Sequence, residues 1–327
     1  MACGHNSVRP EGKIRRLTAS TLLALVLAVA GLPRLAWGEP VSRYFMSGNG
    51  RIHLVSGKTN ATFQGVYRLA DGTYDPAAVK AIHQVFGAHY GDSMATISLR
   101  LIEFLDYLED HLQPGAKITV VSGWRSPQYN TSLREKGRSA AKASLHQYGM
   151  AADVKIDGVP SNRVWNYVKA IQFGGVGYYH GELVHVDVGP ARSWDETTSG
   201  VGTDISDHNK LIGLVTDFDI YRPGDPMIMR FIRMTAFPVG VQRTFLIEAA
   251  AADQGPGQAI TFTPAFAVDA SGQCPQFADI GEMMGIKTIL PKDLPPGRYR
   301  IKARFCQRLW DDMPAEVATP EFEITRR

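Results

Sequence analysis

Two histidines and one aspartate are of the right type, and at a suitable spacing, to bind a metal ion together. His146 and Asp153 lie within the stretch SLHQYGMAAD at 144–153, and His185 follows Asp153 by 32 positions. A catalytic zinc site uses three protein ligands with nitrogen, oxygen or sulfur donors and keeps one position open. His146, Asp153 and His185 are therefore candidate zinc ligands.

These three residues would meet if the chain around them formed a turn and two neighbouring strands. The segment from His146 to Asp153 is typical of a turn that leads into a strand, with Gly149 at the tight backbone and small residues at Ala151–Ala152. His185 lies in a second β-like run that could pair beside the first. The alternative is that each is an isolated polar residue on a strand, and spacing alone does not separate the two interpretations.

The surrounding chain has the pattern of an α+β domain. Asp75 and Pro76 have the residue types expected at a helix N-cap and first turn. Apolar residues then recur at helical spacing up to Leu112. We expect a small antiparallel sheet with flanking helices, which comprise a hairpin over 51–67, helices over 77–86, 93–112, 127–136 and 162–171, and strands over 117–121, 151–156 and 183–188.

The sequence changes in character after Trp194. Residues 195–202 are polar and contain glycine, which is typical of a linker. From about Lys210 onward, short β-rich runs recur between Pro and Gly turns, which predicts an antiparallel β-sandwich. The runs are 227–234, 243–249, 259–266, 299–305 and 321–325. We predict a metal-binding domain over 39–197 and a β-sandwich-like domain over 205–327, whose role the sequence does not indicate.

The first 38 residues have the three parts of a secretory signal peptide. A basic start with Lys13, Arg15 and Arg16 precedes the apolar run 18–31, and the tripeptide 36–38 offers small residues at a cleavage site. The apolar run is short for a membrane span of about 20 residues. We therefore expect cleavage after residue 38 and no stable membrane anchor. The protein is predicted to be periplasmic or secreted, through the Sec route or, given the arginine pair, the twin-arginine route.

The charge of the mature chain gives no support for nucleic-acid binding. The precursor carries 35 basic and 32 acidic residues, and residues 1–38 contain five of the basic and one of the acidic residues. The mature chain therefore has 30 basic and 31 acidic residues, and its formal net charge is −1. The basicity of the precursor belongs to its signal, and we expect no nucleic-acid partner. Nothing in the sequence indicates an oligomeric state.

Two cysteines remain after the predicted cleavage, Cys274 and Cys306. An even number of cysteines in an exported chain is typical of a disulfide, because the compartments outside the cytoplasm are oxidising. The other possibility is two buried free thiols. We favour one disulfide in the β-rich part of the chain.

Three short motifs in the first part of the chain resemble those of the zinc D-Ala-D-Ala metallopeptidases. They are SGWRSP at 122–127, SxHxxGxAxD at 144–153 and HVDVGPxRSW at 185–194. Their order and spacing are similar to those of the exported murein endopeptidase branch, which is related to D,D-carboxypeptidases and phage endolysins. The resemblance covers a little under half of the chain. It implies that His146, Asp153 and His185 bind Zn²⁺ and that Arg125 holds the substrate near the scissile bond.

The resemblance also implies a reaction, the hydrolysis of peptide bonds in bacterial peptidoglycan. We expect an endopeptidase that acts on cross-links between peptidoglycan peptides. The alternatives are a D,D-carboxypeptidase that trims stem peptides, or a non-catalytic zinc-containing protein that binds peptidoglycan. Retained metal without turnover would distinguish the binding protein from both enzymes.

A carboxylate near the metal should transfer the proton during hydrolysis. Glu182 is the first candidate, because several branches of the family carry an acid three residues before the last histidine. In a regular strand, however, positions 182 and 185 face opposite sides, so Glu182 requires a turn before the strand. Asp187 shares a face with His185 and could instead orient its ring. We place Arg125, Glu182 and Asp187 together as the candidate catalytic residues.

Overall fold

The computed structural model describes residues 41–92, 95–137, 140–199, 211–250, 259–268 and 272–326. The predicted signal peptide lies outside the described residues, as does the end of the predicted linker. The described residues between 41 and 326 belong to one compact unit. In the part of the chain that the structure describes, no helix is both long and apolar enough to cross a membrane.

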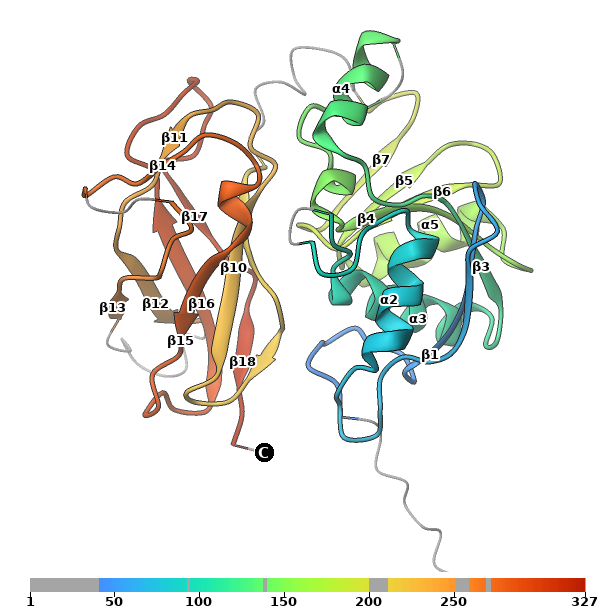
Figure 1. Cartoon of the computed structure of the whole chain (residues 1–327), viewed down its shortest axis with the longest axis horizontal. Coiled ribbons are helices and arrows are strands. Elements are labelled where there is room, and N and C mark those ends of the chain that lie inside the picture. Colours follow the sequence, from blue (N-terminus) through green and yellow to red (C-terminus); the bar gives the residue numbers. More distant parts are fainter. Residues whose placement is uncertain are drawn as a thin grey trace, which may run out of the picture. The chain divides into compact units, whose positions relative to one another are not determined.

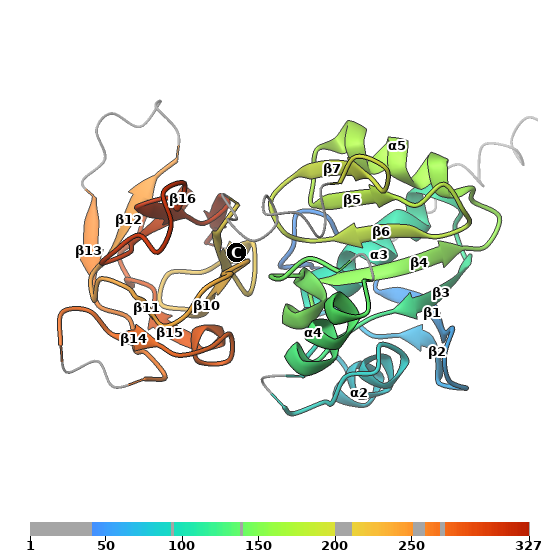
Figure 2. The ribbon, with the colours of Figure 1, turned by 90° about the horizontal axis from the view of Figure 1, so that it is seen from above.

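A seven-stranded sheet forms the centre of the α/β region, which we define as residues 41–199 (Figures 1 and 2). The strand order is β2-β1-β3-β4-β6-β5-β7, and neighbouring strands are antiparallel except for the parallel pairs β1–β3 and β5–β7. The mixed content agrees with the predicted α+β class, but the sheet is larger than predicted and not wholly antiparallel. The strands are β1 (Arg51–Ser56), β2 (Thr62–Val66), β3 (Lys117–Ser122), β4 (Ala151–Ile156), β5 (Gly175–Tyr178), β6 (Val184–Asp187) and β7 (Arg192–Asp195).

The helices of the α/β region lie close to their predicted positions. Helix α2 begins as predicted, because the Asp75 side chain accepts a hydrogen bond from the Ala77 backbone N–H at 2.8 Å. Helix α3 begins later than predicted. Ser98 before it is extended and donates its backbone N–H to the Gly149 carbonyl oxygen. The helices are α2 (Pro76–Val85), α3 (Leu99–Leu112), α4 (Pro127–Glu135), the 3₁₀ helix η1 (Leu145–Tyr148) and α5 (Ser161–Ile171).

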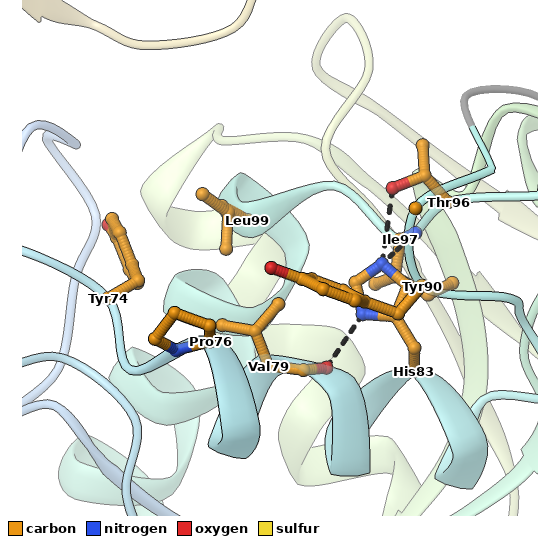
Figure 3. Close-up of a pocket in the computed structure, with 9 residues that line it drawn as sticks. Tyr74, Pro76, Val79, His83, Tyr90, Thr96, Ile97 and Leu99 are labelled. Atoms are coloured by element: carbon orange, nitrogen blue, oxygen red, sulfur yellow. Dashed lines mark hydrogen bonds between the residues drawn. The ribbon is translucent and has the colours of Figure 1, made fainter.

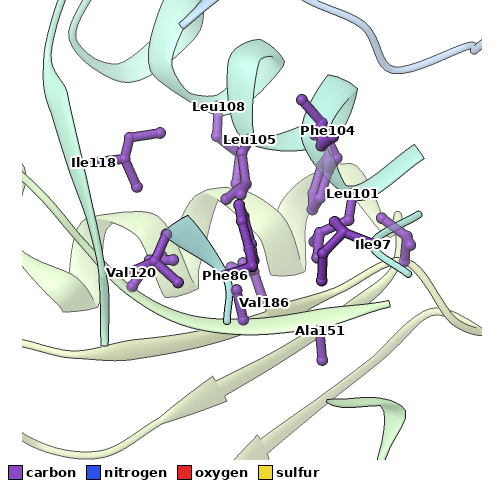
Figure 4. Close-up of a cluster of buried hydrophobic side chains, with 14 of the residues drawn as sticks. Phe86, Ile97, Leu101, Phe104, Leu105, Leu108, Ile118, Val120, Ala151 and Val186 are labelled. Carbon is purple, nitrogen blue, oxygen red and sulfur yellow. The ribbon is translucent and has the colours of Figure 1, made fainter. Parts of the chain in front are cut away.

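Strand alternation gives this sheet one apolar face and one face with polar side chains. Helix α3 covers the apolar face, where its side chains pack on those of the strands (Figure 4). Asp153 on β4 pairs with His185 on β6. Each of them is next in sequence to an apolar residue of the packed face, Val154 or Val186. Because successive side chains point to opposite faces, Asp153, His185 and Asp187 lie on the face away from α3. The packed residues include Leu101, Phe104, Leu105 and Leu108 of α3 and Ile118, Val120, Val154 and Val186 of the sheet.

The β region, which we define as residues 211–326, consists of strands and one 3₁₀ helix, η2 (Glu282–Met284), among its described residues. Its sheets have the orders β15-β10-β8, β11-β14 and β13-β12-β16-β18-β9, and β17 pairs with β16. The strands are β8 (Gly213–Thr216), β9 (Ile220–Tyr221), β10 (Pro226–Ile232), β11 (Val239–Gly240), β12 (Phe245–Ala249), β13 (Ile260–Phe262), β14 (Gln276–Phe277), β15 (Ile286–Ile289), β16 (Gly297–Arg304), β17 (Glu316–Ala318) and β18 (Phe322–Ile324).

A second buried cluster, distinct from the one under α3, fills the β region. Its largest side chains include Phe231, Phe245 and Phe277. Cys274 and Cys306 form a disulfide, with their Cα atoms 6.2 Å apart. The prediction of one disulfide in this part of the chain is therefore confirmed.

Candidate metal centre

Three potential ligand atoms converge on the polar face of the seven-stranded sheet. His146 Nε2 lies 3.3 Å from His185 Nδ1 and 3.5 Å from Asp153 Oδ1, and the latter two atoms are 3.1 Å apart. In a tetrahedral site with zinc bonds of about 2.0–2.2 Å, ligand atoms lie about 3.4 Å from one another. The donor types and the spacing of this buried cluster therefore fit Zn²⁺.

The pairing of β4 with β6 positions two of these residues. Asp153 and His185 are direct cross-strand neighbours in an antiparallel ladder. Side chains at such positions project from the same face with their Cβ atoms about 5 Å apart. The sequence-based expectation that the two strands lie side by side is therefore confirmed, and the separation of Asp153 and His185 is fixed by the backbone.

His146 comes from η1, which leads into β4 through Gly149. Its Nδ1 lies 2.8 Å from the Gly123 carbonyl oxygen, which can only accept, so Nδ1 carries the proton and Nε2 presents a lone pair to the cluster. Gly149 has a φ of 62°, and a Cβ there would collide with the Thr96 carbonyl oxygen. Both conformation and space therefore require glycine, as the sequence predicted.

Asp187 bonds to the ring of His185 from the interior of the fold. Its Oδ2 lies 3.0 Å from His185 Nε2, so the protonated Nε2 donates to the carboxylate and Nδ1 faces the cluster. Arg192 donates to Oδ1 at 2.9 Å and to Oδ2 at 2.6 Å, and the backbone N–H groups of Gly175 and Gly189 also donate to Oδ1. Because this fully buried carboxylate is surrounded by protein donors, the geometry favours an orienting role.

The three side chains of the cluster shift one another's pKa values. Burial alone would raise the pKa of Asp153, but the neighbouring His146 and His185 rings hold it well below its ordinary value. Burial lowers the pKa of His146, which favours the neutral ring that binds metals. Burial acts in the same direction on His185, but hydrogen bonds to Asp153 and Asp187 outweigh it and raise the pKa. Metal binding at Nδ1 would therefore compete with a proton there.

A β-bulge in β3 brings Ser122 to the polar face. Val120 pairs with Val154, but Ser122 pairs with Asp153, so two steps along β3 correspond to one step along β4. The extra residue, Val121, reverses the alternation of side chains. Ser122 therefore lies on the same face as Asp153 rather than in the core below α3.

Arg125 lies beside the cluster because Ser122 and Asp153 hold it. Ser122 Oγ accepts from Arg125 Nε at 3.0 Å and from Nη2 at 2.9 Å. Nη2 also donates to Asp153 Oδ2 at 2.9 Å. The guanidinium is thus fixed against the oxygen of Asp153 that does not face the two histidines, and Nη1 takes no part in these bonds.

Tyr179 also contacts the cluster, although the sequence analysis did not select it. Its hydroxyl donates to Asp153 Oδ1 at 2.9 Å. Its ring centroid lies 5.4 Å from that of Trp194, which is 5.5 Å from the ring of His185. Burial and the charge of Asp153 raise the pKa of Tyr179, so it remains a donor. Its position in the β5–β6 connection was the available signal, but β5 was not recognised as a strand.

Glu182 and His180 lie in the connection between β5 and β6. Strand β6 begins at Val184, so the turn that a role for Glu182 requires is present. The Glu182 side chain is 77% exposed and forms an ion pair with Lys155 at 2.9 Å. His180 has a positive φ of 58° and pairs with Asp195. Among the described residues, the side chains of the three candidate ligands bond instead to one another and to Gly123, Arg125, Tyr179 and Asp187.

A cavity of about 410 Å³ lies elsewhere in the α/β region (Figure 3). It contains His83, whose Nδ1 lies 2.8 Å from the Val79 carbonyl oxygen and whose Nε2 accepts from the Ile97 N–H at 3.1 Å. Both ring nitrogens thus have partners within the fold, which is typical of a structural histidine. None of the three candidate ligands is among the lining residues, which are Tyr74, Pro76, Val79, His83, Tyr90, Gly91, Thr96, Ile97 and Leu99.

Comparisons with known proteins identify a family for the segment that contains this cluster. The model of the family described as peptidoglycan L,D-endopeptidase MepK matches residues 47–194. A Haemophilus influenzae protein named probable peptidoglycan L,D-endopeptidase MepK is 32% identical over 138 residues, which are 42% of this chain and 74% of the relative. The peptidoglycan L,D-endopeptidase MepK of Escherichia coli K12 is 32% identical over 114 residues, 35% of this chain and 63% of that relative. The chain belongs to the peptidoglycan L,D-endopeptidase MepK family, and this confirms the resemblance to murein endopeptidases.

Proposed function

We propose that this protein is a zinc-dependent endopeptidase that hydrolyses an L,D peptide bond in peptidoglycan. The observation that carries the proposal is the convergence of His146 Nε2, Asp153 Oδ1 and His185 Nδ1 at the spacing of a zinc site. The cluster lies inside the segment that the family model matches. The names of the relatives describe endopeptidases, so carboxypeptidase trimming and non-catalytic binding are not favoured.

His146, Asp153 and His185 would hold the metal in this proposal, with the two histidine rings in the tautomers set by Gly123 and Asp187. A zinc ion bound there would polarise the scissile carbonyl and lower the pKa of a water molecule to about 7. Asp187 and Arg192 keep the His185 ring in place behind the ligands. The side chains that would bind the metal are thus held in their orientations before the substrate binds.

Arg125 is the residue that we expect to bind the substrate next to the cluster. Its Nε and Nη2 are fixed by Ser122 and Asp153, which leaves Nη1 to donate to a carbonyl or carboxylate oxygen of the peptide. A fixed guanidinium stabilises developing negative charge without a large rearrangement during the reaction. Tyr179 supports the same group of residues through its hydrogen bond to Asp153.

Glu182 is the proposed proton-transfer residue. The turn before β6 frees it from the strand alternation that would turn it away from His185. The proposal requires its carboxylate to leave Lys155 and take a proton from the attacking water, then deliver it to the leaving amine. His180 in the same connection is the second candidate for the delivery step, because its exposed ring is a proton donor when protonated.

We also propose that the protein acts after export, in the periplasm or outside the cell, where peptidoglycan lies. The β region is proposed to be a β-sandwich. The support for this is that β10 and β12, from different sheets, contribute Phe231 and Phe245 to one buried cluster. The disulfide in this region is consistent with an oxidising compartment.

The test is digestion of purified cross-linked muropeptides by the mature protein, with products identified by mass spectrometry. We expect dimers to become monomers in the presence of zinc and not after chelation, with fragment masses that name an L,D bond. Loss of a terminal residue alone would indicate a carboxypeptidase. No product from a folded, zinc-loaded protein would refute the proposed enzyme.

Two variants assign roles in the same assay. His146→Ala should lose both zinc and activity, and full zinc occupancy in this variant would contradict its role as a ligand. Glu182→Gln should retain zinc but lose activity by about 10²–10⁴-fold, as expected for removal of a general base. If Glu182→Gln keeps wild-type turnover while His180→Ala loses it, the proton-transfer role belongs to His180.

A further inference from the structure

The β region lies beyond the segment that the family match covers, so the family supplies no role for it. We propose that the β region is a positioning element for the metal centre. It holds the first turn of α3 and the end of η1, and these two elements hold His146. The inference rests on the proposed metal site but not on the proposed substrate or reaction.

A buried ion pair joins the β region to α3. Arg100 Nη1 lies 2.9 Å from Asp219 Oδ1, and the side chains are only 5% and 4% exposed. Arg100 Nη2 also donates to the Thr216 carbonyl oxygen at 2.9 Å. Removing one member of such a pair leaves a buried charge without its partner, which is strongly unfavourable. The pair therefore fixes the first turn of α3 against the segment that follows β8.

The start of the α/β region strengthens this connection. The Asp219 Oδ2 atom accepts from the Phe45 N–H at 3.1 Å, and the Asp219 N–H donates to the Arg43 carbonyl oxygen at 2.9 Å. The Tyr44 hydroxyl donates to the Asp217 carbonyl oxygen at 2.8 Å. Asp219 therefore bonds at once to α3 and to the segment 43–45, and both belong to the α/β region.

The first turn of α3 is bonded to the loop that carries His146. Ser98, the residue before α3, donates its N–H to the Gly149 carbonyl oxygen at 2.9 Å. Gly149 in turn donates to the His146 carbonyl oxygen at 3.3 Å. Only one residue separates Ser98 from Arg100. A displacement of the ion pair would therefore move the backbone that sets the position of the His146 ring in the cluster.

Tyr148 gives η1 a second contact with the β region. Its side chain is buried and lies near the backbone of Arg233 and Met234 in the β region. The buried cluster under α3 contains side chains of η1 together with side chains of the β region. They are Leu145, Tyr148, Val215, Ile232 and Met284. The element that carries His146 is thus packed against the β region directly as well as through α3.

The test uses the full mature chain with Asp219→Asn or Arg100→Met. Zinc affinity is measured by competition with a chromogenic chelator, and hydrogen exchange of residues 145–150 is measured in the metal-free protein. Both are recorded at a temperature where thermal unfolding shows each variant to be folded. We expect zinc affinity to fall about 10–100-fold, the range for lost outer support of a metal ligand, and exchange in η1 to become faster.

The conservative variant Arg100→Lys should retain most of the affinity, because it keeps the charge opposite Asp219. Glu316→Gln is the matched control. Glu316 pairs with Arg304 at 2.8 Å in the same region, and these side chains are 33% and 67% exposed. This control should bind zinc like the wild type.

Wild-type zinc affinity and wild-type exchange of η1 in both Asp219→Asn and Arg100→Met would overturn the proposal. If those two variants do not fold, Tyr148→Leu removes the buried aromatic ring at the second contact and should still accelerate exchange in η1. An unchanged exchange rate there would equally overturn it. A protein that binds zinc in the expected way but cuts no muropeptide would refute the proposed function and leave this inference standing.

Discussion

Ser122 lies directly opposite Asp153 across the β3–β4 ladder, on the face that carries the three candidate metal ligands. Its hydroxyl accepts two N–H groups of Arg125, whose Nη2 also reaches Asp153. The position of the guanidinium therefore depends on a serine that one bulged residue, Val121, has moved out of the core.

Ser122→Ala should reduce catalysis without removing the metal. The variant loses the acceptor for two charged N–H groups, and hydrogen bonds to charged groups contribute about 1.5–3 kcal/mol. We expect kcat/KM to fall about 10-fold or more while zinc affinity stays unchanged. Ser132→Ala on α4 is the control, and Ser122→Ala with control-like kinetics would show that Arg125 does not need this support.

Asp187→Asn should weaken metal binding. The amide cannot accept as two carboxylate oxygens do, so the Arg192 guanidinium loses an oxygen partner and His185 loses the acceptor that sets its tautomer. Such changes behind a ligand reduce metal affinity about 10–100-fold. The measurement is a competitive chelator titration, with Asp157→Asn as the control at a half-exposed ion pair. Equal affinities of the two variants would contradict the orienting role.

Stability should decrease as the pH rises from about 4 to about 7 because of Asp106. This carboxyl is buried on α3, where Oδ2 accepts from the Tyr67 hydroxyl and the Gly50 N–H, and burial raises its pKa to about 7. Below pH of about 4 both folded and unfolded states are protonated. Between about 4 and 7 only the unfolded state ionises, so the free energy of unfolding falls by up to about 4 kcal/mol.

Asp106→Asn should remove this part of the pH dependence. Urea unfolding at pH 5 and pH 7.5 measures it, with the exposed Asp311→Asn as the control. A wild-type difference between the two pH values in Asp106→Asn would assign the pH dependence to other groups, among which the buried Glu103 also has a raised pKa because of its burial.

Reduction of the Cys274–Cys306 disulfide should lower the melting temperature. The bond closes a loop with a sequence separation of 32, and a loop of that length restricts the unfolded chain by about 3–4 kcal/mol. Thermal unfolding with and without reductant tests this, and the double variant Cys274→Ala/Cys306→Ala should not respond to reductant. Titration of two free thiols in the native oxidised protein would rule the bond out.

The parts of the fold that the sequence predicted have strong local signals. Asp75 and Pro76 mark the start of α2 by residue type alone, and Gly149 satisfies a backbone need that no other residue meets. The candidate ligands His146, Asp153 and His185 are predictable because their donor types and the spacing of their motifs can be read directly from the sequence. The residues that bond to these ligands depend on tertiary structure. The motifs alone did not show that Arg192 donates to both carboxylate oxygens of Asp187.

The features that the sequence did not predict depend on pairing between distant segments. Strand β5 begins with Gly175 and contains Gly177, so it lacks the β-branched pattern by which strands are recognised. Because β5 was not recognised, the β5–β6 hairpin that carries Tyr179 could not be predicted. The bulge at Val121 is likewise a property of the β3–β4 register, which no local propensity encodes. The signal peptide and the boundary between the two predicted domains stay predictions.

The cross-strand pairing of Asp153 with His185 also has a consequence for the order in which the protein matures. The chain between these two residues forms α5 and β5 before it returns as β6. An extended chain holds His146 and Asp153 near each other but keeps His185 far away, so high-affinity metal uptake must follow closure of this long loop. At the proposed zinc site, metal binding would therefore be a late event in folding, and the rate of zinc uptake by refolding protein would report when β6 joins the sheet.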